Sequence, residues 1–271
     1  MSTVLVTGAN RGIGLELCRQ LKARGDDVIA VCRASSSDLD ALGVRVEAQV
    51  DVTSDPSVAA LVTRLAGTKL DVLVNNAGDF KMLPLPGEHG PRVASNELAA
   101  DVASLFAINI IPPSALAHVL RHLQLRASHP KQLDVLSSAA LEIFPGNNPY
   151  GVTKVAHERL SLAVVAETRA RLKTYRVYPS NTDTRIVAGF SVPKLTPGYV
   201  GEQAVAMMHE GNATDLYLKM TNSGPVVARG LLRYEQFLQQ DGLAFDGLAL
   251  VRAHRALLEQ ELMPAAESSH Q

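Results

Sequence analysis

Short apolar runs alternate along the chain with stretches in which apolar residues recur at every third or fourth position. The runs at 3–6 and 28–31 are continuous, as expected of strands that are buried on both faces. Between them, Ile13, Leu17 and Leu21 share one face of a helix. The alternation continues downstream. It predicts a doubly wound α/β fold, in which helices cover both faces of a parallel sheet.

The middle of the chain follows the same plan. A long helix is expected over roughly 96–124, and two consecutive prolines should kink it just after Asn109. A strand at 133–136 and a helix over about 151–172 come next. These elements place several polar residues at strand ends and on one helix face, where candidate chemistry is found.

No repeat or linker divides the chain, so a single domain is expected. The alternating pattern ends near residue 222, and 1–222 is expected to form the main α/β unit. Over 223–271 the spacing predicts two further helices packed on the same domain. The apolar stripe of the first of them comprises Val227, Leu231, Tyr234 and Leu238.

Composition narrows the class of protein. The 271 residues are 46% hydrophobic and 20% charged, with a formal net charge of −1, which gives no electrostatic case for nucleic acid or an acidic membrane surface. No stretch approaches a membrane span in length, so a cytoplasmic protein is expected. Cys18 and Cys32 have no CxxC partner, and the histidines show no ligand spacing. Free thiols and no metal site are therefore expected.

A glycine-rich turn joins the first strand to the first helix. Glycine allows the backbone to turn sharply and to approach a pyrophosphate, which the helix N-terminus then faces. Such glycines also occur in ordinary tight turns, but their position in a βα unit favours a dinucleotide site. The residues expected to cradle the cofactor here are Gly8, Asn10, Arg11, Gly12, Ile13 and Gly14.

The tip of the second strand indicates which dinucleotide is bound. A carboxylate at this position binds the ribose diol of NADH, but this chain has Arg33 there. A guanidinium attracts a 2′-phosphate, and Arg11 is placed to assist. The sequence therefore predicts NADPH over NADH. The alternative is that both arginines are ordinary solvated residues.

Two further strand ends are expected to border the adenosine half of the cofactor. Asp51 and Val52 follow the third strand, and Asp51 could accept a hydrogen bond from the adenine amino group. A helix cap formed by Asp51, Ser54 or Asp55 is the competing interpretation. After the fourth strand, Asn75 and Asn76 could tie strand tips together. Asn76, Ala77 and Gly78 are predicted to contact the cofactor.

Tyr150 and Lys154 lie four residues apart on a predicted helix and project from one face. A nearby ammonium is expected to lower the pKa of a phenol toward neutrality, where a general acid is most effective. This pair also occurs by chance, but Ser137 and Ser138 precede it and could hold a substrate oxygen. Asn109 could hold a water beside Lys154, or only satisfy backbone groups freed by the kink.

These motifs, in this order over about residues 3–190, resemble the short-chain dehydrogenase/reductase family, most closely its carbonyl-reductase and C-factor-like members. The resemblance implies a Rossmann-like NAD(P)-binding catalytic domain and a tetrad of Asn109, Ser138, Tyr150 and Lys154. It also places Thr184 near the nicotinamide carboxamide. The family's usual serine-to-tyrosine spacing is one residue longer than that from Ser138, so Ser137 stays open as the alternative.

The expected function is NADPH-dependent reduction of a carbonyl to an alcohol, reversibly. A small or medium apolar ketone or aldehyde is expected, because the segments 80–83, 139–144 and 186–195 are largely apolar. The alternative is an NADP-binding sensor that kept the fold with little turnover, and a sugar epimerase would need a longer chain. The family resemblance implies a homodimer or homotetramer.

Overall fold

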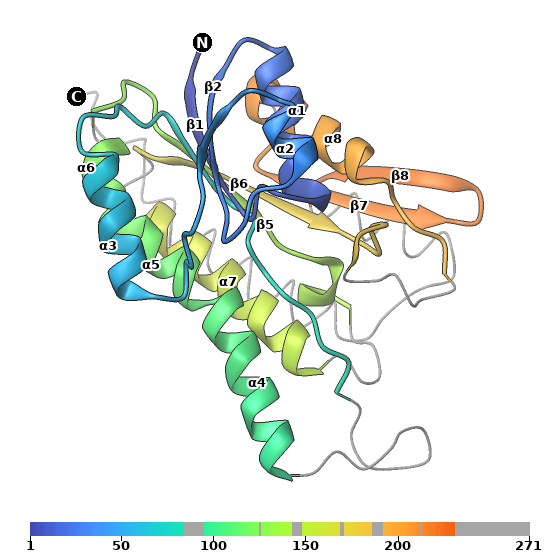
Figure 1. Cartoon of the computed structure of the whole chain (residues 1–271). Helices are drawn as coiled ribbons and strands as arrows, with labels where there is room; N and C mark the ends of the chain where they lie inside the picture. The colour runs from blue at the N-terminus through green and yellow to red at the C-terminus, as the bar shows by residue number, and fades with distance from the viewer. Residues whose placement is uncertain are drawn as a thin grey trace, which may run out of the picture.

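The computed structural model describes residues 1–83, 95–124, 126–142, 148–168, 171–185, 192–211 and 213–230. Its centre is one eight-stranded sheet in the order β3-β2-β1-β4-β5-β6-β7-β8 (Figure 1). Strands β1 to β7 pair in parallel, and β8 is antiparallel to β7. The strands are β1 (Thr3–Thr7), β2 (Asp27–Val31), β3 (Arg45–Glu47), β4 (Val72–Asn75), β5 (Lys131–Val135), β6 (Lys173–Pro179), β7 (Asp215–Thr221) and β8 (Gly224–Arg229).

Helices cover both faces of the sheet, as the sequence predicted (Figure 1). On one face, α1 (Gly12–Ala23) and α8 (Pro197–Glu210) pack side by side on a core that includes Val4, Leu17 and Met207. On the other, α3 (Asp55–Arg64) and α5 (Ile111–Val119) enclose a second core, which includes Leu5 and Leu61. The remaining helices are α2 (Ser37–Asp40), α4 (Ser95–Asn109), α6 (Arg121–Gln124), α7 (Asn148–Glu167) and the 3-10 helix η1 (Ser138–Ala140).

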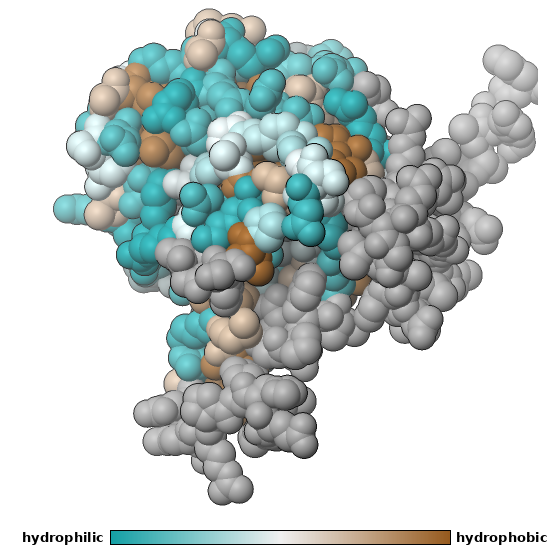
Figure 2. Space-filling view, turned by 90° about the vertical axis from the view of Figure 1, so that its right-hand side faces the viewer, coloured by the Kyte–Doolittle hydropathy of each residue, from teal (hydrophilic) through white to brown (hydrophobic). Residues whose placement is uncertain are grey.

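The face seen in Figure 2 is mainly hydrophilic. Apolar residues appear there as small separate patches among the described residues. A folded domain with buried cores on both sides of its sheet is expected to have such a surface.

The long helix predicted over 96–124 is divided where the prolines indicated. Helix α4 ends at Asn109, and α5 begins at Ile111 with Pro112 and Pro113 in its first turn. By length and composition, residues 98–119 could cross a membrane. However, α4 and α5 both contact α7, and the helix is interrupted at Ile110. Packing within the domain accounts for part of the apolar character of this stretch, of which 33% is buried.

The prediction of a helix starting near Val227 is wrong for the residues described. Gly224–Arg229 form β8, which makes a hairpin with β7 through Asn222 and Ser223. Val226 and Val227 are both only partly buried, because an edge strand buries little of either face. Residues 231–271, which hold the rest of the predicted helices, lie outside the described part of the chain.

Candidate active site

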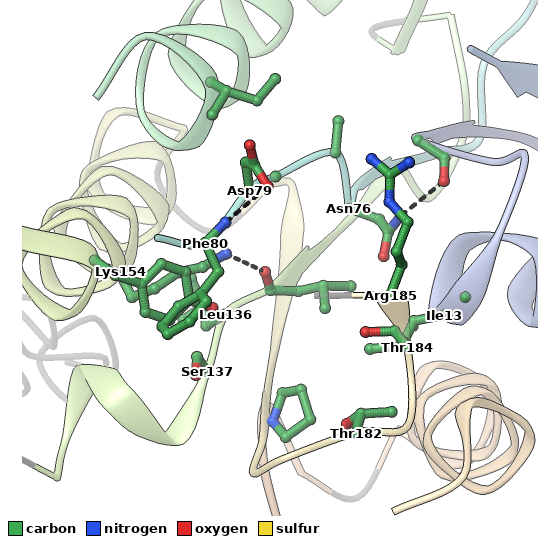
Figure 3. A pocket seen from close by; sticks show the side chains of 18 of the residues that line it. Ile13, Asn76, Asp79, Phe80, Leu136, Ser137, Lys154, Thr182, Thr184 and Arg185 are labelled. Carbon is green, nitrogen blue, oxygen red and sulfur yellow. Dashed lines mark hydrogen bonds between the residues drawn. The ribbon is translucent and has the colours of Figure 1, made fainter. Parts of the chain in front are cut away.

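The carboxyl ends of β1, β2, β4, β5, β6 and β7 border one cavity of about 800 Å³ (Figure 3). This volume lies in the range of small-molecule and cofactor sites, and the edge is where open α/β sheets bind ligands. The fold brings the predicted site residues together here. All of them except Gly14 and Asn109 line the cavity.

The glycine turn after β1 leaves room for a phosphate only because it lacks side chains. Gly8 and Gly12 have φ angles of +64° and +55°, which other residues rarely adopt. A Cβ on Gly14 would lie 2.3 Å from the carbonyl oxygen of Gly8, so this position excludes any larger residue. The N-terminus of α1 follows directly, and its first N–H groups face an anion favourably. These residues fit the pyrophosphate of a dinucleotide.

Asn76 and Thr7 join the tips of β4 and β1, as predicted for the paired asparagines. The side-chain amide of Asn76 donates to the carbonyl oxygens of Thr7 (2.9 Å) and Gly8 (3.2 Å). In return, the hydroxyl of Thr7 accepts from the backbone N–H groups of Asn76 (3.0 Å) and Ala77 (3.1 Å). These reciprocal hydrogen bonds fix the glycine turn relative to the segment after β4, which also lines the cavity.

At the adenosine end, Arg33 is exposed at the tip of β2 and lies close enough to Asp51 to lower its pKa. The larger cause of that lowering is Thr53, whose hydroxyl and N–H both donate to Asp51 Oδ1. Asp51 therefore caps this turn while it lines the cavity. Ser54 is the N-cap residue of α3, but its side chain makes no capping hydrogen bond.

A third arginine, Arg185, joins the two arginines that the sequence predicted. Burial is the main cause that lowers the pKa of Arg11, and the charges of Arg185 and Arg33 lower it further. The three guanidinium groups are therefore close enough to repel one another. Figure 3 shows Arg185 extending past Thr184 toward Asn76. Arg185 was not predicted from the sequence, because its charge comes near the glycine turn only where the described segment after β6 passes that turn. Thr184 also meets that turn: a Cβ on Gly12 would lie 3.1 Å from its methyl group.

Tyr150 lies in the first turn of α7, with its ring edge-on to Phe80 at a centroid distance of 5.0 Å. Its hydroxyl is hydrogen-bonded to the side chain of Ser137. Ser138 is buried and opens the short helix η1, which Ser137 caps by accepting from the N–H of Ala139. This contact favours Ser137, the alternative that the sequence left open, as the serine beside the tyrosine, and Ser138 lines the same cavity.

Lys154 lies beside Tyr150, but without a bound cofactor its ammonium donates a hydrogen bond to the backbone and not to the tyrosine hydroxyl. Its ammonium is 5.7 Å from the centre of the Tyr150 ring and donates to the carbonyl oxygen of Val135, 3.2 Å away. A Cβ on Gly78 would lie 3.7 Å from this ammonium, so the β4 segment borders it directly. Lys154 thus occupies the floor of the cavity between β4, β5 and α7.

The pKa values differ from the sequence-based expectation. Burial raises the pKa of Tyr150 to about 12, and nearby Asp79 raises it as well, whereas the bond with Ser137 lowers it. Burial also lowers the pKa of Lys154 to about 8, which the charge of Asp134 partly opposes. Loss of solvation outweighs the attraction between phenolate and ammonium. In the protein alone, Tyr150 is a proton donor at neutral pH.

Asn109 uses its side chain to hold the segment after β4. Its Oδ1 accepts from the N–H of Asp79 (2.9 Å), and its Nδ2 donates to the oxygens of Asp79 (2.9 Å) and Thr153 (3.1 Å). The backbone groups that Asn109 satisfies belong to Asp79 after β4 and not to the kink at Pro112 and Pro113, so neither interpretation made from the sequence is confirmed.

The substrate end of the cavity is more polar than predicted. Phe80, Met82 and Met220 line it, together with Lys219 of β7 and Glu142 after η1. These last two form an ion pair at 2.8 Å. Residues 143–144 and 186–191, also predicted to line the pocket, lie outside the described residues, whereas Val192 of the same predicted loop lines the cavity.

A family model for short chain dehydrogenase matches residues 2–193. The chain belongs to the short-chain dehydrogenase family. A tropinone reductase homolog of Arabidopsis thaliana is 30% identical over 200 residues, which cover 68% of this chain and 72% of the relative. The 1-hydroxy-2-glutathionyl-2-methyl-3-butene dehydrogenase of Rhodococcus sp. (strain AD45) is 54% identical over 80 residues, 29% of this chain and only 35% of that relative's length.

Solved structures of other short-chain dehydrogenases share the fold. A short chain dehydrogenase from Burkholderia cenocepacia J2315 in complex with NADP is 25% identical and has a TM-score of 0.68. The match covers 97% of this chain and 98% of that one. An alcohol dehydrogenase from Thermococcus sibiricus, 21% identical with a TM-score of 0.68, supports the fold alone; its match covers 80% of this chain and 96% of that one.

Proposed function

We propose that this short-chain dehydrogenase is an NADPH-dependent carbonyl reductase, which converts a ketone or aldehyde to an alcohol reversibly. The observation that carries the proposal is the Ser137–Tyr150 hydrogen bond beside Lys154, in the cavity that the glycine turn also borders. A binding module has no need of a phenol beside a buried ammonium at this place. Relatives named as reductases, such as (−)-isopiperitenone reductase of Mentha piperita, give further support, although the matched segment spans only 28% of that protein.

In the proposed reaction, the side chains of Ser137, Tyr150 and Lys154 have separate roles. When bound, the nicotinamide supplies the hydride that reduces the carbonyl carbon. Ser137 and Tyr150 hold the carbonyl oxygen with their hydroxyls, and Tyr150 transfers its proton to that oxygen as negative charge develops. The resulting phenolate is stabilised by the ammonium of Lys154 and regains a proton from solvent. The high pKa of Tyr150 keeps the acid protonated before the transfer, which suits reduction.

The preference for NADPH over NADH rests on Arg33. It stands at the tip of β2 where a carboxylate would select NADH, and Arg11 and Arg185 add positive charge to the same cleft. A solved relative in complex with NADP supports the proposal. Dissociation constants for both cofactors test it, and NADH binding as tight as NADPH binding would reject the role of Arg33.

The proposed substrate has an apolar body of small or medium size beside its carbonyl, because Phe80, Met82, Ile108 and Met220 line this end of the cavity. A screen of neutral ketones and aldehydes, followed through NADPH absorbance, tests the activity. The Tyr150→Phe protein is the control. Tight NADPH binding without any turnover would favour the binding-only alternative.

We also propose a cytoplasmic homodimer or homotetramer. Exposed apolar residues on α4, α5 and α7 support an assembly through these helices: Phe106, Ile111, Val152 and Val155. Light scattering measures the assembly directly, and a monomer would reject it.

A further inference from the structure

An ion pair lies inside the substrate end of the cavity. Lys219 of β7 donates to Glu142, which follows η1, at a nitrogen–oxygen distance of 2.8 Å. The two side chains are only 16% and 11% exposed, and both residues line the cavity. Removing charged groups from water is costly, so a pair placed among apolar lining residues is expected to have a structural or a binding role. The surroundings of each partner indicate which role this pair can have.

The lysine stands where β7 leaves the core of the protein. The first four residues of the strand are buried, whereas Lys219 and the two residues after it are partly buried. Because side chains alternate along a strand, Lys219 shares a face with Tyr217. The ring of Tyr217 stacks on Tyr178 of β6 at a centroid distance of 4.5 Å, and the hydroxyl of Tyr178 donates to Glu158 of α7. Lys219 therefore projects from the α7 face of the sheet, near the carboxyl end of β7.

The glutamate is fixed relative to Ser137, which is proposed to hold the substrate carbonyl. The N–H of Glu142 donates to the carbonyl oxygen of Ser138, 2.8 Å away, and the N–H of Leu141 donates to the same oxygen at 2.9 Å. Both bonds continue the turn of η1, which Ser137 caps. Because Glu142 in turn binds Lys219, the lysine ammonium also lies at a defined distance from Ser137.

The ion pair can bind a further polar group. A lysine ammonium can donate several hydrogen bonds, and in the described part of the chain Lys219 bonds to Glu142 alone. A carboxylate can likewise accept several hydrogen bonds at once. A hydroxyl group matches this pair, because its oxygen can accept from Lys219 while its proton is donated to Glu142.

The balance of charge at this end of the cavity favours a neutral group over an anion. Lys219 is paired with Glu142, and Lys81, which also lines the cavity, is paired with Asp101. An anionic group of a substrate would be attracted by either lysine but repelled by its carboxylate partner. A hydroxyl meets no such repulsion and can bind while the ion pair stays intact.

We propose that Lys219 and Glu142 determine substrate specificity by binding a hydroxyl group of the substrate, away from the carbonyl that is reduced. The substrate is then a hydroxyketone or hydroxyaldehyde whose two oxygens are joined by an apolar chain, and the product is a diol. This inference rests on the proposed function for the reaction, but the preference for a hydroxyl can also be measured by binding. Neither residue acts on the reacting atoms.

Matched substrates test the proposal. A series of straight-chain hydroxyketones is compared with alkanones of the same chain length, and the ratio of their kcat/KM values measures the preference. Lys219→Met removes the ammonium, and the double variant Lys219→Met/Glu142→Leu leaves no charge unpaired. In both variants the preference for the best hydroxyketone should fall by about tenfold or more, because a hydrogen bond to a charged group is lost.

Lys194→Met is the matched control. The side chain of Lys194 is 18% exposed and also pairs with a carboxylate, that of Asp183 at 3.7 Å, but Lys194 is not among the described residues that line the cavity. This variant should keep the wild-type preference. If the Lys219 variants lost activity equally toward both kinds of substrate, the pair would only support the fold and the inference would be overturned. A wild-type preference for keto acids over hydroxyketones would also overturn it.

A binding measurement separates this inference from the proposed function. If no carbonyl compound is reduced, the proposed function fails, and calorimetry in the presence of NADP then decides the role of the pair. The best hydroxyketone should bind the wild-type protein about tenfold more tightly than its matched alkanone, and Lys219→Met should remove the difference. Equal binding of the two compounds by the wild-type protein would overturn the inference.

Discussion

Lys154 donates a hydrogen bond to the carbonyl oxygen of Val135, 3.2 Å away, and so ties α7 to the last residue of β5, two positions before Ser137. The bond fixes the register of the helix that carries Tyr150 against the strand end that carries its hydroxyl partner. The lysine therefore has a structural role in addition to its charge.

Ser137→Ala should lower kcat by about a hundredfold or more, because it removes a hydroxyl that holds the developing oxyanion. Ser138→Ala is the matched control and should change kcat by less than about tenfold, since Ser138 is buried at the start of η1. Steady-state kinetics with NADPH measures both. If Ser138→Ala were the more damaging change, the assignment of Ser137 would be incorrect.

Arg33→Asp should weaken NADPH binding by about ten- to a hundredfold, because it replaces a charge-assisted contact with repulsion of the 2′-phosphate. NADH binding should stay equal or become tighter. Isothermal titration calorimetry measures both affinities. Arg19→Asp, an exposed change on α1 with the same loss of charge, should leave the preference unaltered. A similar loss in both variants would indicate only a general electrostatic effect.

The stability of the wild-type protein relative to Lys154→Met should rise with pH. The folded pKa of Lys154 is about 8, below its value in the unfolded chain, so the unfolded chain binds more protons between these two values. Raising the pH therefore relieves the cost of burying the charge, by about 2 kcal/mol between about pH 7 and pH 9.5. Urea unfolding of both proteins measures the difference. If the difference in unfolding free energy between the two proteins did not change with pH, the pKa of Lys154 would be the same in the folded and unfolded chains.

Thr7→Val should reduce the free energy of unfolding by about 2 kcal/mol. The change leaves the N–H groups of Asn76 and Ala77 without their acceptor, and removes the donor to the oxygen of Val74. Thr63→Val is the control, because exposed Thr63 bonds only within its own helix and should change stability by less than about 0.5 kcal/mol. Equal effects would show that the Thr7–Asn76 exchange does not hold the strand tips together.

The local sequence pattern was sufficient to predict most strands of the sheet and the polar residues that follow them. Continuous apolar runs identify strands buried on both faces, and the glycine turn and the Tyr150–Lys154 spacing are short-range signals. The strand at 224–229 was missed because Val227 fits the apolar stripe of a helix that continues through Leu231 as well as it fits an edge strand. Its antiparallel pairing with β7 decides that it is a strand, and the spacing of apolar residues does not predict this pairing.

Residues that reach the site from distant segments could not be predicted in the same way. The charge of Arg185 acts on Arg11 from 174 positions further along the chain, and Lys219 pairs with Glu142 across 77 positions of sequence. The predicted lowering of the Tyr150 pKa was also wrong. Burial raises this pKa, and burial depends on how distant segments pack. The choice between adjacent Ser137 and Ser138 depends on where β5 ends.

The most direct measurement of the central claim follows deuterium from the nicotinamide C4 of labelled NADPH into the product of a reduced ketone. The wild-type enzyme should place the label on the carbinol carbon, and Tyr150→Phe should lower the rate of labelling by about a hundredfold or more while NADPH still binds. Unlabelled product, or equal labelling by the two proteins, would contradict Tyr150 as the acid beside the nicotinamide.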